Sequence, residues 1–375
     1  MRLQRRRYFF SNEIIIERKH DIPINEACEE VVISRESNPE VLDALIEMGL
    51  SHYDDYLTKN EVEQIHRLSA FHYDEIPYRD ELFERNSFKG VIHFEEFQFF
   101  TGIESIDDCL FRGCSKLERI ILPKTITKIP LCMFEGCSSL TSVYIPDSVQ
   151  SIEQSAFSNC SSLKGINIPN SVVEIGGLAF SGCGALSSLK LPNRLQTIAF
   201  QLFKGCNQLR DVTAPYGLKS IESRAFQGCH HLESFYIPQT VELIAGDCFI
   251  DCDNHINVCI DSGNDYYEIT DGIIFNKDRT SLIRFLNNNT PSYIIPNSVK
   301  VISSGSFSCC SNLVSITIPS SVNTIESCAF LNCEHLVSVF FQPRSLNNTE
   351  TFTLEGSAFE GCINCKHSVN PVLAV

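Results

Sequence analysis

A phenylalanine followed three residues later by a cysteine recurs ten times, and this repeat limits the possible folds more than any other feature of the chain. The first seven copies are spaced 23 residues apart, and three more follow an interruption; the phenylalanines are Phe111, Phe134, Phe157, Phe180, Phe203, Phe226, Phe249, Phe307, Phe330 and Phe359. Leucine, isoleucine and proline positions recur in phase with them. A fixed period of this length indicates a solenoid in which each repeat forms one turn, here called a rung.

One rung illustrates the fold that the repeat predicts. Its inward-facing candidates are Leu140, Val143 and Ile145, and residues 143–145 alternate inward and outward as in a short strand. Tyr144 points outward, and Pro146 ends the strand because proline has no N–H to donate. Residues 148–152 are predicted to form a second short extended segment, and residues 153–160 have room for one or two helical turns. A rung has too little core to fold alone, so adjacent rungs must stack.

The rung resembles the repeat of the BspA-type leucine-rich repeat family. The shared pattern is [A/C]-F-x-x-C-x-x-L-x-x-I-x-I-P-x-S-V-x-x-I, and it covers about residues 101–365. The resemblance implies a leucine-rich repeat solenoid, mostly β with short helical turns, preceded by a small α-helical region. It also implies adhesion or host-contact roles, often at the cell surface or in secreted proteins.

Ten of the 18 cysteines form a ladder, one to a rung: Cys114, Cys137, Cys160, Cys183, Cys206, Cys229, Cys252, Cys310, Cys333 and Cys362. Stacked Cα atoms would lie about 5 Å apart, but their Cβ atoms would point the same way, which makes the torsion of roughly 90° that a disulfide needs hard to reach. We therefore predict reduced, buried thiols that fill space and donate weak hydrogen bonds to neighbouring turns. A disulfide framework suits small secreted chains, and this chain is neither small nor visibly secreted.

Residues 38–68 are predicted to form two helices joined by a loop. The first ends near Gly49, and the second runs from Lys59 to Leu68 with Thr58 as its N-cap. This segment resembles the EF-hand-like or dockerin-like helix–loop–helix that precedes repeats in some relatives. The run D-x-[DN]-x-[DN]-G of a calcium loop is absent, so we favour a structural hairpin without metal over weak ion binding by Asp54, Asp55, Glu61 and Glu63.

The predicted domains are an N-terminal region and solenoid cap (1–100), the solenoid (101–365) and a C-terminal tail (366–375). Residues 88–102 are expected to cover the apolar end of the first rung. The interruption contains a predicted β-hairpin insert at about 261–292, with Asp271-Gly272 as a turn. Such an insert is familiar in the BspA-type family, and it either projects from the side of the solenoid or adds strands to its sheet. A shorter insert is predicted around 347–355.

Charge and hydropathy narrow the range of partners. The net charge is −16, of which residues 1–100 carry −9 (12 Lys+Arg against 21 Asp+Glu) and the remainder −7 (18 against 25). Such a chain repels phosphate backbones, so we predict no nucleic-acid partner. The arginines at 2, 5, 6 and 7 precede an apolar run broken by Ser11-Asn12-Glu13, and no stretch is long enough to span a membrane. The prediction is therefore a cytoplasmic protein if the start is native.

No catalytic motif is recognised, and we predict no enzyme activity, cofactor or metal. Patterns such as H-E-x-x-H, G-x-S-x-G, Walker and G-x-G-x-x-G are absent in context. Cys362, Cys365 and His367 resemble half a zinc site, but a closed site needs four ligands and the repeat already explains Cys362. A hydrolase or metal-dependent enzyme located in the insert or the N-terminal region remains a remote alternative.

The outward strand position is the candidate binding surface. It forms a row of Ile121, Tyr144, Asn167, Lys190, Thr213, Tyr236, Cys259, Thr317 and Phe340. Exposed aromatic side chains often anchor protein interfaces, although tyrosine and threonine are also good strand formers. We predict a non-enzymatic protein-interaction module for adhesion or cell-surface recognition, with an intracellular scaffold using the same face as the alternative.

Overall fold

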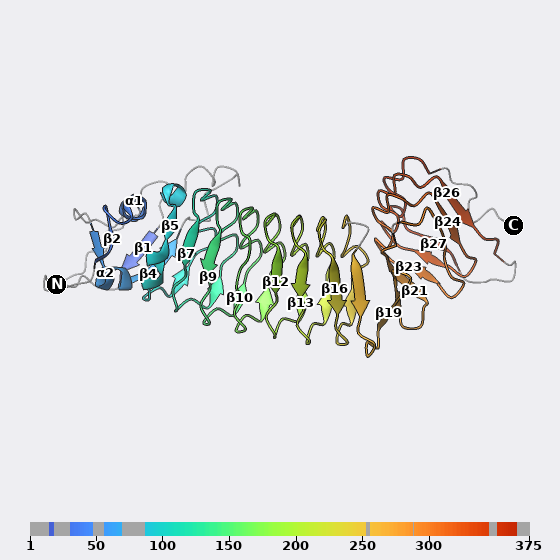
Figure 1. The fold of residues 1–375 in the computed structure, drawn as a ribbon, viewed down its shortest axis with the longest axis horizontal. Coiled ribbons are helices and arrows are strands. Elements are labelled where there is room, and N and C mark those ends of the chain that lie inside the picture. Colours follow the sequence, from blue (N-terminus) through green and yellow to red (C-terminus); the bar gives the residue numbers. More distant parts are fainter. Residues whose placement is uncertain are drawn as a thin grey trace. The chain divides into compact units, whose positions relative to one another are not determined.

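The computed structural model describes residues 15–18, 31–47, 56–69, 87–252, 256–287, 289–344 and 351–365. The chain divides into two compact units, Met1–Leu186 (unit 1) and Ser187–Val375 (unit 2). Within each unit, short parallel strands from successive rungs pair into sheets (Figure 1). The register shifts by one period from strand to strand, as where Ile120 lies opposite Val143. The predicted solenoid of 23-residue rungs is confirmed.

The solenoid of unit 1 has two sheets, one for each extended segment of the rung. The first contains β5 (His93–Phe94), β7 (Arg119–Ile121) and β9 (Ser142–Tyr144). The second contains β8 (Lys128–Ile129), β10 (Ser151–Ile152) and β11 (Glu174–Ile175). In β9 the Val143 side chain is buried between two exposed neighbours, as the alternation predicts. Residues 165–168 form no strand, and Gly165, which lacks a side chain to pack, weakens pairing there.

The segment around each phenylalanine is a series of tight turns and does not become an α-helix. In the rung of Phe157, Ser158 donates to the carbonyl of Ser155 and Cys160 to that of Phe157, the i to i+3 spacing of a 3-10 turn. In most rungs two residues adopt left-handed backbone angles and stop a helix from continuing, here Ser155 at φ 57° and Asn159 at φ 60°. Glycine takes the second of these positions in many rungs, as Gly136 does at φ 77°.

Stacked phenylalanine rings form the centre of the core. In unit 1 the ring centroids of Phe111, Phe134, Phe157 and Phe180 follow one another at 5.2–5.5 Å, and in unit 2 those of Phe203, Phe226 and Phe249 at 5.2–5.4 Å. Within the interruption the stack resumes at Phe285, which stands 22 residues before Phe307, one fewer than a full period, and the two ring centroids are 5.0 Å apart. These rings have little or no contact with solvent.

Aromatic side chains also cover the first rung. Phe88, Phe94 and Phe97 are fully buried, and their ring centroids lie 4.9–6.1 Å from that of Phe111. They come from the 3-10 helix η3 (Ser87–Gly90), from β5, and from the 3-10 helix η4 (Glu95–Phe99). This cluster keeps the apolar end of the stack away from water.

The N-terminal region corrects the predicted helix–loop–helix. The first helix is present as α1 (Pro39–Glu47), and Thr58 caps α2 (Lys59–Glu63) in a reciprocal capping box with Glu61. The second helix, however, ends at Glu63. Residues predicted to continue it form β4 (Ile65–Ser69), which pairs with β1 (Ile15–Arg18) and β6 (Ser105–Ile106).

The segment between the two predicted helices, the candidate calcium-binding loop, contains a strand. β3 (Tyr56–Thr58) pairs with β2 (Val31–Ser34) and leads directly into α2. The region is therefore a mixed α/β structure and lends no support to an EF-hand-like or dockerin-like motif. Asp54 and Asp55 lie outside the described residues, as do the arginines at positions 2–7 and the tail 366–375.

Unit 2 continues the same repeat and then changes at the interruption. Its first sheet contains β12 (Ser188–Lys190), β14 (Asp211–Thr213), β16 (Ser234–Ile237) and β18 (Asn257–Ile260). Its second contains β13 (Thr197–Ile198), β15 (Ser220–Ile221) and β17 (Leu243–Ile244). After the interruption, the outward strands are β22 (Ser292–Ile294), β24 (Ser315–Ile318) and β26 (Ser338–Phe341).

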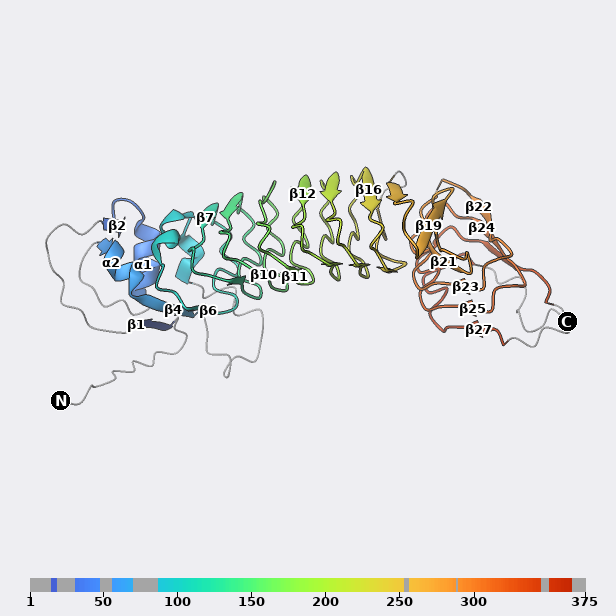
Figure 2. The same ribbon diagram turned by 90° about the horizontal axis from the view of Figure 1, so that it is seen from below.

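The predicted hairpin insert adds strands to a sheet. β19 (Tyr267–Thr270), β20 (Ile273–Asn276) and β21 (Ser281–Phe285) are antiparallel, with Asp271 and Gly272 at the first turn. Both turn residues have positive φ, 51° and 73°. β21 then pairs in parallel with β23 (Val301–Ile302), followed by β25 (Thr324–Ile325) and β27 (Thr353–Leu354) (Figure 2).

Candidate functional site

The predicted outward row lies on the strand faces, and neighbouring members pair in register. Ile121 lies opposite Tyr144 in unit 1. In unit 2, Lys190 lies opposite Thr213, Tyr236 opposite Cys259, and Thr317 opposite Phe340. About half of each aromatic side chain is exposed, 54% for Tyr144, 51% for Tyr236 and 50% for Phe340. Asn167 is also exposed, although its rung has no strand.

The sequence-based row omitted its most exposed apolar member. Ile294 on β22 lies opposite Thr317 and is 69% exposed. It stands directly before Ile295-Pro296, as Tyr144 stands before Ile145-Pro146. This shared Ile-Pro signal could have identified it, but Ile294 follows the hairpin insert, where counting by the period fails.

Two exposed tyrosines in unit 2 are held by polar neighbours from the next rung. The Tyr236 hydroxyl donates a short hydrogen bond to the Asp261 carboxylate, and the Gln239 amide donates one to the Tyr216 hydroxyl. The bond between Tyr236 and Asp261 raises the pKa of the phenol and lowers the pKa of the carboxyl. These contacts restrict the rings and reduce the entropy that a binding partner must remove.

Eight of the ten ladder cysteines are buried as expected, and Cys252 and Cys362 are partly buried. Ladder thiols donate to the backbone carbonyl of the phenylalanine in the preceding rung, at 3.0–3.2 Å; these are Cys137, Cys160, Cys183, Cys229, Cys252, Cys333 and Cys362. Burial raises the pKa of Cys137 and takes that of Cys183 to about 12, which keeps both thiols protonated at neutral pH. The cysteines in the described part of the chain form no disulfide bonds, and Cys259 is exposed on the outward row.

A recurring glutamate links successive rungs and was not anticipated. Where glutamate stands four residues before the phenylalanine, its carboxylate accepts an N–H from the preceding rung. The carboxylate of Glu222 accepts from Phe200 at 2.8 Å, and that of Glu326 from Ser304 at 2.8 Å. The recurring Ile-Glu pair, as at Ile221-Glu222, was the available signal.

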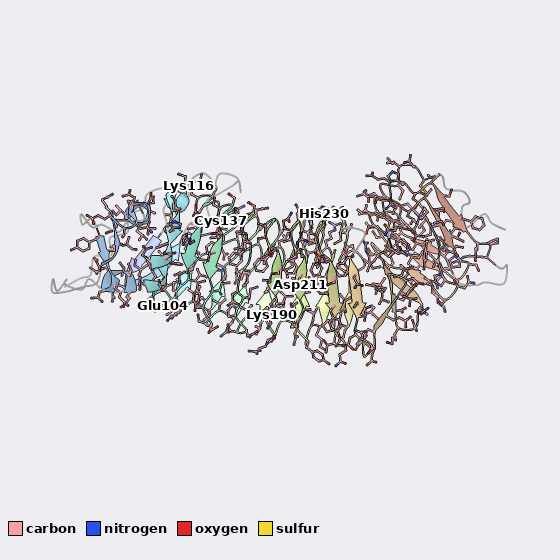
Figure 3. The ribbon with its side chains drawn as sticks, in the orientation of Figure 1. Glu104, Lys116, Cys137, Lys190, Asp211 and His230 are labelled. Carbon is pink, nitrogen blue, oxygen red and sulfur yellow. The ribbon has the colours of Figure 1, made fainter. Side chains whose placement is uncertain are left out.

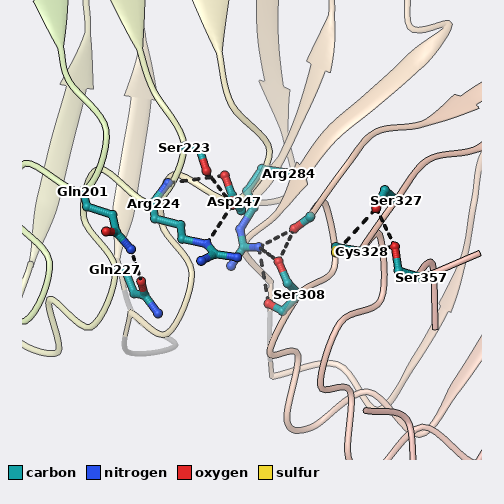
Figure 4. A network of polar contacts seen from close by, with 11 residues as sticks. Gln201, Ser223, Arg224, Gln227, Asp247, Arg284, Ser308, Ser327, Cys328 and Ser357 are labelled. Carbon is teal, nitrogen blue, oxygen red and sulfur yellow. Dashed lines mark hydrogen bonds and ion pairs between the residues drawn. The ribbon is translucent and has the colours of Figure 1, made fainter. Parts of the chain in front are cut away.

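Arg284 on β21 occupies the interruption and is almost fully buried (Figure 4). Its guanidinium donates to the carbonyls of Phe249 at 3.2 Å, Gly305 at 2.9 Å and Ser308 at 3.3 Å. The hairpin is therefore tied both to the last rung before the interruption and to the first rung after it. A buried arginine whose two terminal NH2 groups donate to backbone carbonyls has a structural role.

A second buried polar residue ends the regular rungs. Asn264 stands one period after Val241, where the core position is otherwise apolar, and it is fully buried. Its amide donates to the carbonyls of Pro238 and Val241, and its oxygen accepts from the N–H groups of Tyr266 and Tyr267. The side chain therefore joins the preceding rung, through its amide, to the turn that opens the hairpin, through its oxygen.

No group of three or more His, Cys, Asp or Glu side chains suited to a metal ion occurs among the described residues. The thiol of Cys362 donates to the carbonyl of Phe330, and His367 lies outside the described part of the chain. None of the helices that the structure describes has the length and apolar character needed to cross a membrane.

Several solved structures are similar to this chain. A leucine-rich cell surface protein from Faecalibacterium prausnitzii A2-165 matches with a TM-score of 0.56 and 27% identity, covering 72% of this chain and 84% of that protein. The pneumococcal vaccine antigen PcpA matches with a TM-score of 0.48 and 21% identity over 60% and 68%. The leucine-rich repeat protein TpLRR of T. pallidum is 32% identical over 39% and 71%, with a TM-score of 0.35. No curated protein matches the chain.

A family model for the BspA type leucine rich repeat region matches residues 81–188, 173–285 and 281–371. These matches span most of the chain and include both the regular rungs and the interruption. They agree with the repeat, the phenylalanine stack and the parallel strand register described above. The chain belongs to the BspA-type leucine-rich repeat family.

Proposed function

We propose that this chain is a protein-binding module of the adhesion or cell-surface recognition type, which contacts its partner through the outward strand row. The observation that carries the proposal is the exposure of Tyr144, Tyr236 and Phe340 on strands whose inward side chains are buried. Rigid strands hold these rings in position, and aromatic residues are enriched at interface hot spots. The likeness to a leucine-rich cell surface protein supports the location.

Site-specific photo-crosslinking in native cells tests the use of this face. A photoreactive phenylalanine replaces Tyr144 or Tyr236, and the control replaces Glu174, which is exposed on β11 in the other sheet. We expect adducts from positions 144 and 236 and none from position 174. Equal capture from both faces, or capture from position 174 alone, would show that the row is not the binding surface.

Substitution of the exposed tyrosines measures how much they contribute to the affinity for the partner. The double variant Tyr144→Ser and Tyr236→Ser should bind the captured partner about tenfold or more weakly, because exposed aromatic anchors contribute more than about 1 kcal/mol each at interfaces. Glu174→Ser serves as the matched control and should bind as the unaltered chain does. Unchanged affinity in a folded double variant contradicts the proposal.

The free thiols favour an intracellular scaffold as a second candidate, because abundant unpaired cysteines suit a reducing compartment. A membrane-impermeant thiol reagent applied to intact cells separates the two candidates, with the exposed Cys259 as its target. Labelling before lysis, together with removal by external protease, supports the cell-surface function. Protection of Cys259 until lysis supports the scaffold, and a Cys259→Ser variant controls for other reactive thiols.

A further inference from the structure

The outward face of β22, β24 and β26 differs from the rest of the row because it has no charge. The strands and the residue before each of them span 291–294, 314–318 and 337–341, and none of these residues is Asp, Glu, Lys or Arg. Exposed apolar side chains gather there, namely Ile294, Val314, Val337 and Phe340, at 69%, 42%, 39% and 50% exposure. The inward residues Ile316 and Val339 are fully buried, so the exposed side chains stand on a packed sheet.

The corresponding face earlier in unit 2 has the same backbone geometry but is charged. Lys190 and Asp211 lie on β12 and β14 (Figure 3), and an ion pair of 2.9 Å joins Arg210 to Glu233 immediately before β14 and β16. Covering that face would remove these charges from water, which is costly. Covering the face of β22, β24 and β26 removes apolar and hydroxyl groups only, and depletion of charge is a property of interface cores.

We propose that the β22–β24–β26 face is a self-association surface that binds the same face of a second copy of this chain. Each copy has a net charge of −16, so contacts between charged faces of two copies meet like-charge repulsion. A charge-free face is matched by its own copy, whereas a charged partner surface would bury charges here without counter-charges.

The order of the side chains also suits a two-fold axis. Ile294, Thr317 and Phe340 lie opposite one another across the three strands, with an apolar residue on each side of a central hydroxyl. A two-fold axis that is parallel to the strands and passes over Thr317 therefore brings Ile294 of each copy towards Phe340 of the other. Such an isologous contact is the commonest way in which soluble chains form dimers. Two sheets meeting face to face pack about 10 Å apart.

Sedimentation velocity on the full chain tests the proposal over a series of protein concentrations, at about 0.05 M and about 0.5 M NaCl. We expect a monomer–dimer equilibrium that shifts towards dimer at the higher salt, because salt screens the repulsion between acidic copies and leaves the apolar contact intact. Phe340→Ser and Ile294→Ser should each weaken dimerisation at least tenfold. Tyr236→Ser, on the charged face of the same unit, should leave it unchanged.

Three results would overturn the proposal: a monomer at every concentration and salt, a dimer equally tight in Phe340→Ser and Ile294→Ser, or a dimer that weakens as salt rises. Circular dichroism and melting confirm that each variant is folded. A photoreactive phenylalanine at position 340 gives an independent measurement; an adduct of twice the chain mass supports self-association, and adducts with other proteins alone contradict it. Both proposals use Phe340, and Tyr236→Ser separates them because it should weaken partner binding and leave self-association unchanged.

Discussion

At the scale of single residues, the ladder cysteine combines a small volume with a hydrogen-bond donor. The thiol fits beside the stacked rings and reaches the carbonyl of the preceding phenylalanine, as Cys137 reaches Phe111 at 3.0 Å. That carbonyl also accepts the N–H of Cys114, three residues further along its own turn. The thiol thus gives a second bond to an acceptor with two lone pairs. Repetition of this contact joins each turn to the next.

Burial of these thiols predicts a loss of stability in alkali. Unfolded thiols ionise above about pH 9, whereas the pKa of folded Cys183 lies at about 12, so the unfolded state releases protons that the native state retains. The stabilisation is complete below about pH 9 and declines as pH rises towards 12. Each thiol whose pKa is raised in this way, as that of Cys183 is, lowers the free energy of unfolding by about 1.4 kcal/mol per pH unit in this window.

Denaturant titrations between pH 8 and pH 11 measure this slope. Cys183→Ser removes one titrating group. The unfolding free energy of this variant should therefore fall less steeply with pH, by the contribution of one thiol. Cys259→Ser, at an exposed position outside the ladder, is the matched control for the substitution of cysteine by serine itself. Identical slopes for all three proteins would mean that the ladder thiols ionise as readily in the folded chain as in the unfolded one.

At the scale of elements, the hairpin β19–β20–β21 takes the place of regular rungs without ending the core. Phe285 places a ring in the stack where the repeat itself supplies none, and β21 starts the parallel pairing that β23, β25 and β27 continue. Arg284 fixes this arrangement, because its hydrogen bonds reach the rungs on both sides of the interruption.

Arg284→Met should lower the free energy of unfolding of unit 2 by about 3 kcal/mol, because buried carbonyls of both rungs lose their donor. Arg279→Met is the control on the same hairpin. Arg279 forms an ion pair with Glu268 at the surface, and loss of this pair should lower the free energy of unfolding by less than about 1 kcal/mol. Hydrogen exchange should show faster opening of β21 and β23 in Arg284→Met only. Equal effects of the two variants would assign Arg284 no special part in joining the rungs.

At the scale of the whole molecule, each rung contacts mainly its neighbours, so the period itself can be tested. Deleting residues 198–220 removes 23 residues and places Ile221 in the position of Ile198, which is its partner in register. Deleting 198–221 removes one residue more and places Glu222 in the same buried position. We expect the first variant to fold cooperatively with lower stability, since the stability of a solenoid is approximately the sum of the contributions of its rungs and of the interfaces between them. The second should fail to fold or lose several kcal/mol, because it buries an unpaired charge.

Circular dichroism and urea unfolding of the two deletions provide the measurement. They differ by a single residue, so composition and length cannot account for a difference between them. Two equally stable deletions would show that the stack tolerates loss of register and that the 23-residue period is not what holds the rungs together.

The sequence alone determined the solenoid, its period, the inward side chains and the cysteine ladder, because the same local pattern recurs and each copy supports the others. It also located the Thr58 N-cap and the Asp271-Gly272 turn, whose chemistry depends on adjacent residues. The outward row was placed on the strand face for the same reason. Its role in binding and the domain boundaries at 100 and 365 stay predictions.

Tertiary structure decided the rest, through partners far apart in the chain. Residues 65–69 have apolar spacing that fits a helix, but pairing with β1 and β6 makes them a strand. The roles of Arg284, Phe285 and Ile294 follow from neighbours that the hairpin brings into place. The 23-residue period does not identify these residues, because they lie in or directly after the interruption. The charge-free face of β22, β24 and β26 likewise exists only when three strands, each 23 residues from the next, lie side by side.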